Sequence, residues 1–133
     1  MQRGVWVVYM AVALHLVWGV LFLVSGEALG STPAAALLRL TGSPILAGVL
    51  CLAGAAIAIY GERRRDWWAL LPQQALLVLS AVGSLEAVIG GHYADGVPRP
   101  VVFILSDQLP MILGALFHTL VLVDLGRTWT RPR

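Results

Sequence analysis

The sequence predicts an all-α fold, an integral membrane four-helix bundle that forms one domain over residues 1–133. Of these residues, 59% are hydrophobic and only 12% are charged, whereas a soluble domain carries about 25% charged residues. Four long apolar runs lie at about residues 5–24, 43–60, 67–89 and 101–125. Since about 20 helical residues cross the ~30 Å hydrocarbon core of a bilayer, we interpret each run as one membrane span. We expect consecutive spans to run antiparallel, in an up-down-up-down order.

The first run also has some features of a secretory signal peptide. Arg3 precedes it, and the small residues of Ser25-Gly26 follow it. However, the apolar part of a signal peptide is usually 7–15 residues long, and this run covers residues 5–24. Its length favours a membrane span, and cleavage near Gly26 is the alternative.

A short external helix is expected between the first two spans. Ser31-Thr32-Pro33 is a pattern typical of a helix start, and Gly42 is typical of a helix end. We expect this helix to lie at the membrane interface with three leucines facing apolar surroundings: Leu37, Leu38 and Leu40. In the second span, Pro44 suits the first turn, and Ser43 or Thr41 can serve as the N-cap.

The remaining connections and one proline shape the second half of the bundle. Residues 61–66 form so short a connection that we expect the second and third spans to be antiparallel neighbours. Residues 90–100 contain several glycines and prolines and predict an irregular turn. Pro110, near the middle of the fourth span, cannot donate a hydrogen bond to the carbonyl of Ser106, so we expect a kink there.

Charge placement predicts the orientation in the membrane. Only Arg39 and Arg99 fall on one side, and the other seven basic residues fall on the side of the two termini: Arg3, Arg63, Arg64, Arg65, Arg127, Arg131 and Arg133. Cytoplasmic loops carry an excess of Lys and Arg, so we expect both termini on the cytoplasmic side of a bacterial-type inner membrane. Four tryptophans fall at the same face, where indole rings favour the headgroup level: Trp6, Trp67, Trp68 and Trp129.

Small residues mark the expected contact faces between helices. Lipid tails are as apolar as leucine, so close backbone approach and interhelical hydrogen bonds must hold a membrane bundle together. On the second and third spans, small residues recur at steps of three and four positions: Ala47, Cys51 and Ala55, then Ser80, Gly83, Ser84 and Ala87. We expect these two faces to meet each other or a neighbouring molecule.

Polar residues inside the spans form the candidate site. An ionisable group in the membrane costs about 2.5–3.5 kcal/mol on insertion scales, so each one calls for a functional hypothesis. The candidates are Asp107, His118, His15 and Glu86, and three glutamines are their neutral companions: Gln73, Gln74 and Gln108. One interpretation is a polar path through the bundle for protons or ions. The other is that these groups form hydrogen bonds between helices and stabilise the bundle.

The sequence contains little evidence for a bound cofactor or for catalysis. If the first and fourth spans are antiparallel, helix rise predicts that His15 and His118 lie within about one helical turn of each other in depth. Facing histidines in a bundle can ligate haem iron, so these two could hold a haem, but two lone histidines do not form a motif. We therefore expect no cofactor. The sequence contains no phosphate-binding loop, HExxH motif or nucleophile elbow, which favours a protein without enzymatic activity. Its net charge of +2 gives no reason to expect a nucleic acid partner.

Taken together, these features favour a small membrane protein that works by helix–helix assembly, as a homo-oligomer or as a subunit of a larger membrane complex. At 14.2 kDa, four helices leave little room to enclose a solvated path. A small transporter or holin-like pore that uses the polar residues is the first alternative. A haem- or quinone-associated redox subunit is the second. The expected partners are the lipid bilayer, further copies of the chain and other membrane subunits.

Overall fold

The computed structural model describes residues 4–25, 32–92 and 96–130, and these ranges are almost entirely helical. Their elements follow the chain in the order α1 (Val5–Ser25), α2 (Thr32–Thr41), α3 (Pro44–Arg64), the 3-10 helix η2 (Trp67–Leu70), α4 (Leu71–Gly90) and α5 (Val101–Trp129). Four helical segments are long and apolar enough to cross a membrane: α1, α3, η2 with α4, and α5. The expected all-helical chain with four long apolar helices is confirmed.

The helix starts and ends follow from local chemistry. Pro44 occupies the first turn of α3, and the hydroxyl of Ser43 accepts a hydrogen bond from the backbone N–H of Leu46. Thr32–Thr41 is helical as expected, and Gly42 follows it with a φ of +67°, a left-handed conformation that glycine adopts without steric cost.

One predicted boundary is wrong, because the expected loop at residues 61–66 is largely helical. The last residue of α3 is Arg64, and Arg65 caps the helix in the left-handed conformation with a φ of 54°. Arginine and glutamate are good helix formers, and cations near a helix C-terminus interact favourably with its dipole. These effects extend α3 beyond its apolar part. At the far end of the chain, α5 similarly extends to Trp129, beyond the apolar run that ends near residue 125.

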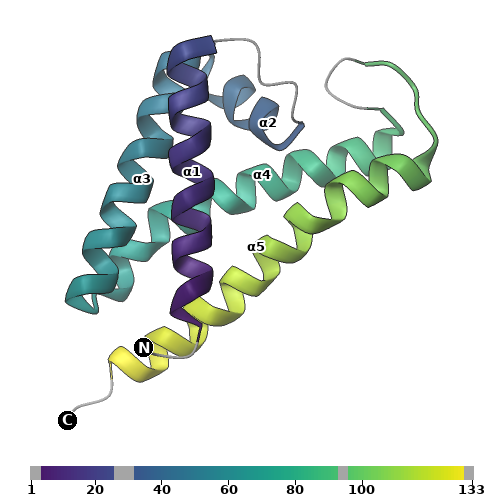
Figure 1. Ribbon diagram of the computed structural model, residues 1–133. Coiled ribbons are helices and arrows are strands. Elements are labelled where there is room, and N and C mark those ends of the chain that lie inside the picture. Colours follow the sequence, from purple (N-terminus) through teal and green to yellow (C-terminus); the bar gives the residue numbers. More distant parts are fainter. Residues whose placement is uncertain (1–3, 26–31, 93–95, 131–133) are drawn as a thin grey trace.

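The helices are arranged as two pairs that cross. Figure 1 shows α1 beside α3 and α4 beside α5, with α2 packed against α4. The start of α1 lies against the end of α5, because Val5 and Val8 share a core cluster with Leu122 and Leu125. A second cluster joins the end of α1 to α2, α3 and α4, and includes Trp18. A third cluster joins α1, α4 and α5 through Ala11, Leu77, Ala81 and Ala115. The core of the described residues is therefore divided into three clusters.

The face of small residues on α3 is used within the chain. Ala47, Cys51 and Ala55 are fully or almost fully buried. On one side of them, a Cβ on Gly48 would lie 3.0 Å from the carbonyl oxygen of Gly19 in α1. On the other side, a Cβ on Gly54 would lie 2.8 Å from Leu76 of α4. This face thus fits between α1 and α4, so the expected neighbour α4 is only one of its two partners. The corresponding residues of α4, which are Ser80, Gly83, Ser84 and Ala87, are also buried.

Candidate functional site

The structure brings two of the predicted site residues together in the interior. His15 on α1 and His118 on α5 have exposed fractions of 0% and 1%. Their imidazole rings lie near enough to interact electrostatically. The sequence predicted that these histidines lie at a similar depth, and their proximity agrees with that prediction.

His118 is held by a chain of hydrogen bonds between α4 and α5. The Oε1 atom of Gln74 lies 2.5 Å from His118 Nδ1, and because an amide oxygen only accepts, Nδ1 carries the proton and donates it. Gln74 Nε2 donates to Thr119 Oγ1 at 2.7 Å, and Thr119 Oγ1 donates to the carbonyl of Ala115 at 2.8 Å. This chain fixes both the amide of Gln74 and the proton position on His118.

His15 has the same protonation pattern with a local partner. Its Nδ1 lies 2.8 Å from the carbonyl oxygen of Ala11 in the preceding turn of α1 and therefore donates to it. The ring of His15 also meets Trp18 edge to face, with the ring centroids 5.9 Å apart. In the neutral form of both histidines, Nε2 is left as the hydrogen-bond acceptor.

The remaining nitrogen of each histidine is buried without a hydrogen-bond partner. Within the described residues, His15 Nε2 and His118 Nε2 share this property with the side-chain oxygens of two glutamines, Gln73 and Gln108. Gln73 does form one contact between helices, because its Nε2 donates to the carbonyl of Val8 at 3.4 Å. Buried polar atoms are normally paired, so these four atoms are exceptions among the described residues.

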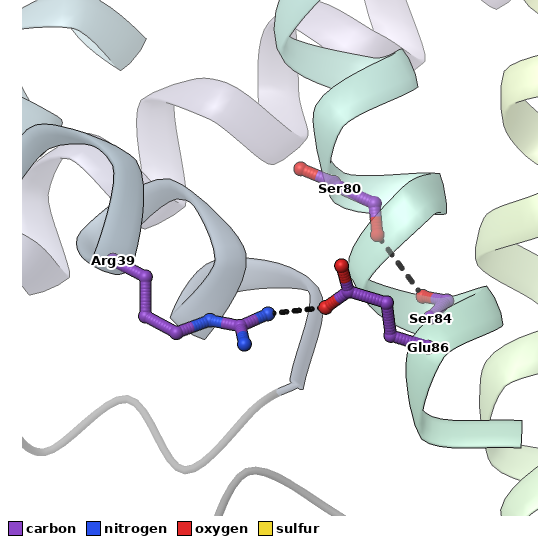
Figure 2. A network of polar contacts seen from close by, with 4 residues as sticks. All are labelled: Arg39, Ser80, Ser84 and Glu86. Carbon is purple, nitrogen blue, oxygen red and sulfur yellow. Dashed lines mark hydrogen bonds and ion pairs between the residues drawn. The ribbon is translucent and has the colours of Figure 1, made fainter. Parts of the chain in front are cut away.

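Glu86 and Asp107 lie apart from the buried histidines. The carboxylate of Glu86 on α4 accepts a hydrogen bond from the guanidinium of Arg39 on α2 at 2.6 Å, and Figure 2 shows this exposed ion pair. Ser84, also drawn there, donates to the carbonyl of Ser80 within α4. Asp107 has an exposed side chain on α5. Of the four ionisable candidates, only the two histidines are both buried and close to each other.

Pro110 does not interrupt α5. The helix is continuous from Val101 to Trp129 with Pro110 inside it. Ser106, whose carbonyl lacks its usual amide donor, is exposed, and its hydroxyl donates to the carbonyl of Phe103 at 2.9 Å.

An apolar groove lies between α1 and α5 and is floored in part by Leu77 of α4. Its volume is about 610 Å³. Its walls are Trp6, Val7, Met10, Ala11, Ala13, Leu14, Val17, Leu77, Pro110, Met111, Leu113, Gly114, Phe117 and His118. No charged side chain occurs among these lining residues, and His118 is the ionisable group in the wall. Of the four residues with an unpaired buried atom, His118 is the one in the groove wall.

The outward side of α5 carries a regular pattern of six apolar residues and one serine. Positions repeat at alternating steps of three and four residues, and all of them are exposed: Val102, Ser106, Leu109, Leu113, Leu116, Leu120 and Val123. In the most apolar part of α5 only 22% of residues are buried, against 39–44% in the other three spans. We refer to these seven residues as the α5 seam.

Sequence reasoning named Gln74 as a polar companion of the candidates but missed Thr119 and the α5 seam. The partners of Gln74 could not be predicted, because they depend on which helices are neighbours. Within the described part of the chain, no group of three or more His, Cys, Asp or Glu side chains could hold a metal ion.

Comparisons with known protein families, with curated proteins and with solved structures found no match to this chain.

Proposed function

We propose that this chain is a small membrane subunit that works by self-association through the α5 seam. The observation that carries the proposal is the spacing of the exposed seam residues. Leu109 and Leu116 are seven positions apart, and so are Leu113 and Leu120. A repeat of this kind lets two helices interlock their side chains as knobs into holes. Because the same seam is present on each copy, a second copy is the partner that fits it.

Packing is the driving force that such an assembly needs in a bilayer. Burying leucine against another protein surface gains nothing over lipid in hydrophobic terms, so regular interdigitation and interhelical hydrogen bonds must stabilise the contact. The seam supplies evenly spaced leucines, and Ser106 lies in register with them. The small-residue faces of α3 and α4 are buried within the chain, which leaves the seam as the regular surface for a partner.

We further propose an antiparallel membrane topology with both termini in the cytoplasm of a bacterial-type inner membrane and α2 at the outer interface. Two observations support it. The start of α1 packs against the end of α5, so these two ends belong on the same side of a membrane. The excess of arginines lies beside these same ends, and Arg39 lies on α2.

A transporter or pore remains the alternative proposal, and the geometry favours it less. A continuous path would have to link Glu86 and Asp107 to the histidines. Glu86 instead pairs with Arg39 at an exposed position, while His118 is bonded to Gln74 in the interior. The polar contacts that join helices support the stabilising interpretation of these groups.

Cysteine cross-linking in native membranes tests self-association. Cys51 is buried and is the sole cysteine, so Cys51→Ala provides a cysteine-free background. In that background, Leu113→Cys and Leu116→Cys should each give disulfide-linked dimers on oxidation. Leu79→Cys, at an exposed position on α4, is the matched control and should remain monomeric.

A second variant measures the strength of the contact. Leu113→Ala combined with Leu116→Ala should weaken dimerisation by roughly tenfold, equivalent to about 1.4 kcal/mol. Equal cross-linking at Leu79 and at the seam would contradict the proposal. So would native mass spectrometry that finds only monomers of the parent protein in lipid nanodiscs.

A further inference from the structure

We propose that the C-terminal end of α3 binds the phosphate of an anionic phospholipid, and that the guanidinium of Arg64 is the main donor to this phosphate. Arg63, Arg64 and Arg65 follow one another at this end, and all three side chains are exposed. The inference goes beyond self-association, because it assigns a lipid partner to a surface that the α5 seam does not include.

The charges of the three arginines are not paired within the fold. Within the described residues, none of the three guanidinium groups forms an ion pair with a carboxylate. Their two acidic neighbours have other partners, because Glu62 accepts a hydrogen bond from the hydroxyl of Tyr9 at 2.6 Å and Asp66 accepts one from the backbone N–H of Trp68 at 3.1 Å. The guanidinium groups are therefore available to an anion from outside the chain.

Arg64 is held in a position that suits a phosphate. Its Cζ atom lies 5.7 Å from the centroid of the Tyr60 ring, and the attraction between a guanidinium and an aromatic face favours this arrangement. A guanidinium carries its N–H donors in one plane, as a fork that matches two oxygens of a phosphate. Tyr60 thus restricts the motion of Arg64 without using these donors.

Arg65 occupies a position where the backbone favours glycine. Its φ is 54°, and its backbone N–H bonds to the carbonyls of Glu62 and Gly61 as the cap of α3. A left-handed residue after a helix is usually glycine, because a Cβ is strained there. The helix end itself therefore gives no reason for an arginine, which supports a role for the charged side chain.

A lipid-facing stripe of α3 leads to Arg64, which favours a phospholipid over a soluble phosphate. Helical residues three and four positions apart lie on one face, and the stripe consists of exposed residues at such steps: Leu46, Leu50, Ala53, Ile57 and Tyr60, followed by Arg64. Ile57 and Arg64 are about 10 Å apart along the helix. An acyl chain lying on the stripe therefore brings its headgroup to Arg64.

Trp68 provides a reporter at the same end of the helix. It follows Arg64 by four residues and is 70% exposed, and indole rings favour the headgroup level of a bilayer. Bromine atoms on a lipid quench tryptophan fluorescence at short range. The emission that is lost in Trp68→Phe therefore measures which lipids lie beside this part of the protein.

The test compares two brominated lipids with the protein reconstituted in vesicles of phosphatidylcholine. One set of vesicles contains a minor fraction of dibrominated phosphatidylglycerol, and the matched set contains the same fraction of dibrominated phosphatidylcholine. Both lipids carry a phosphate, but the choline cation makes the second one neutral. Phosphatidylglycerol should therefore quench Trp68 with roughly tenfold higher apparent affinity, and high salt should reduce this preference, since it screens exposed charges.

Three single substitutions separate recognition by Arg64 from general effects of charge. Arg64→Gln should lower the preference for phosphatidylglycerol roughly fivefold, which is the contribution expected of one basic residue at an anionic surface. Arg64→Lys keeps the charge but loses the paired donors, so it should lower the preference roughly twofold. Arg39→Gln removes the same charge from a residue that pairs with Glu86, and this matched control should leave the preference unchanged.

Two further variants distinguish lipid binding from folding and from self-association. Arg65→Gly should lower the preference without lowering stability in SDS unfolding, because glycine suits the left-handed backbone. Leu113→Ala combined with Leu116→Ala should weaken dimerisation but leave the lipid preference unchanged. Failure of the lipid proposal is therefore distinct from failure of assembly through the α5 seam.

Three outcomes would overturn the proposal. The first is equal quenching of Trp68 by the two brominated lipids at low salt. The second is an equal loss of preference in Arg39→Gln and Arg64→Gln, which would mean that only the net charge of the protein matters. The third is release of phosphatidylglycerol by inorganic phosphate at a concentration similar to that of the lipid, which would assign the arginines to a soluble anion.

Discussion

Gln74 joins α4 to α5 through both halves of its amide. Its oxygen accepts from His118 and its nitrogen donates to Thr119. Hydrogen bonds between membrane helices contribute about 0.6 kcal/mol on average and up to about 1.7 kcal/mol. At the scale of single residues, this amide joins α4 to α5 by two hydrogen bonds.

Replacing Gln74 with leucine should therefore weaken the bundle. Gln74→Leu removes both hydrogen bonds and leaves the Nδ1–H of His118 buried without an acceptor, so the free energy of unfolding should fall by about 1–3 kcal/mol. The measurement is reversible unfolding by SDS in mixed micelles. Ala75→Leu, at an exposed neighbouring position, is the control and should change little. A Gln74→Leu protein as stable as the parent would show that this network does not hold the helices together.

The sequence alone predicted the two histidines of this site but not the hydrogen-bond partners around them. The cost of ionisable groups in a membrane singled out His15 and His118, and helix rise predicted that they lie at a similar depth. The role of Gln74 depends on the rotation of α4 against α5, which no periodicity within one helix specifies. For the same reason, the ion pair of Glu86 with Arg39 was not foreseen.

At the scale of elements, α1 and α3 approach each other through glycine. A Cβ on Gly19 would lie 2.6 Å from Leu52, and a Cβ on Gly48 would lie 2.8 Å from Leu23 and 3.0 Å from the carbonyl oxygen of Gly19. The carbonyl oxygen of Gly19 belongs to the backbone, which cannot rotate away as a side chain can. The α1–α3 contact thus requires glycine at position 48.

Two glycine-to-alanine variants test this close approach with opposite expected results. Gly48→Ala should lower stability by about 1–3 kcal/mol, since extra atoms in a tightly packed contact force the backbone to shift. Gly114→Ala enters open space and should be neutral or stabilise the helix by about 0.5–1 kcal/mol. SDS unfolding of both variants gives the comparison, and equal effects at the two positions would contradict the packing described for α1 and α3.

The positions of the helices along the chain were easier to predict from the sequence than the contacts between them. Apolar runs, Pro44 and Gly42 located the elements from Thr32 to the start of α3 closely, because these signals act within a few residues of chain. The end of α3 was misjudged, since charged residues that are good helix formers continue a helix beyond its apolar part. The α5 seam was missed because an exposed face is defined only once the buried face of α5 is known.

At the scale of the whole molecule, the two ends of the helical chain meet. Gly4 lies beside Val121, and Val5 packs with Leu125. The same end carries four of the six arginines in the described residues: Arg63, Arg64 and Arg65 at the end of α3, and Arg127 near the end of α5. Contacts within the fold thus bring the two ends to the arginine-rich end of the helices, and the positive-inside rule favours the cytoplasm for that end.

Reporter fusions test that orientation. Alkaline phosphatase fused after Thr130 should be inactive and green fluorescent protein at the same position fluorescent, because a cytoplasmic end suits only the second reporter. Fusions after Val97, in the connection between α4 and α5, should show the reverse. Active phosphatase after Thr130 would place the C-terminal end outside and contradict the assignment from arginines.

The central claim is that lipid surrounds these four helices, and extraction of cell membranes with alkaline carbonate tests it most directly. Exposed leucines, valines and phenylalanines cover α1, α3, α4 and α5, so the protein should stay in the membrane pellet after carbonate treatment and enter solution only with detergent. Recovery of the protein in the carbonate supernatant, or in buffer after lysis without detergent, would contradict the account.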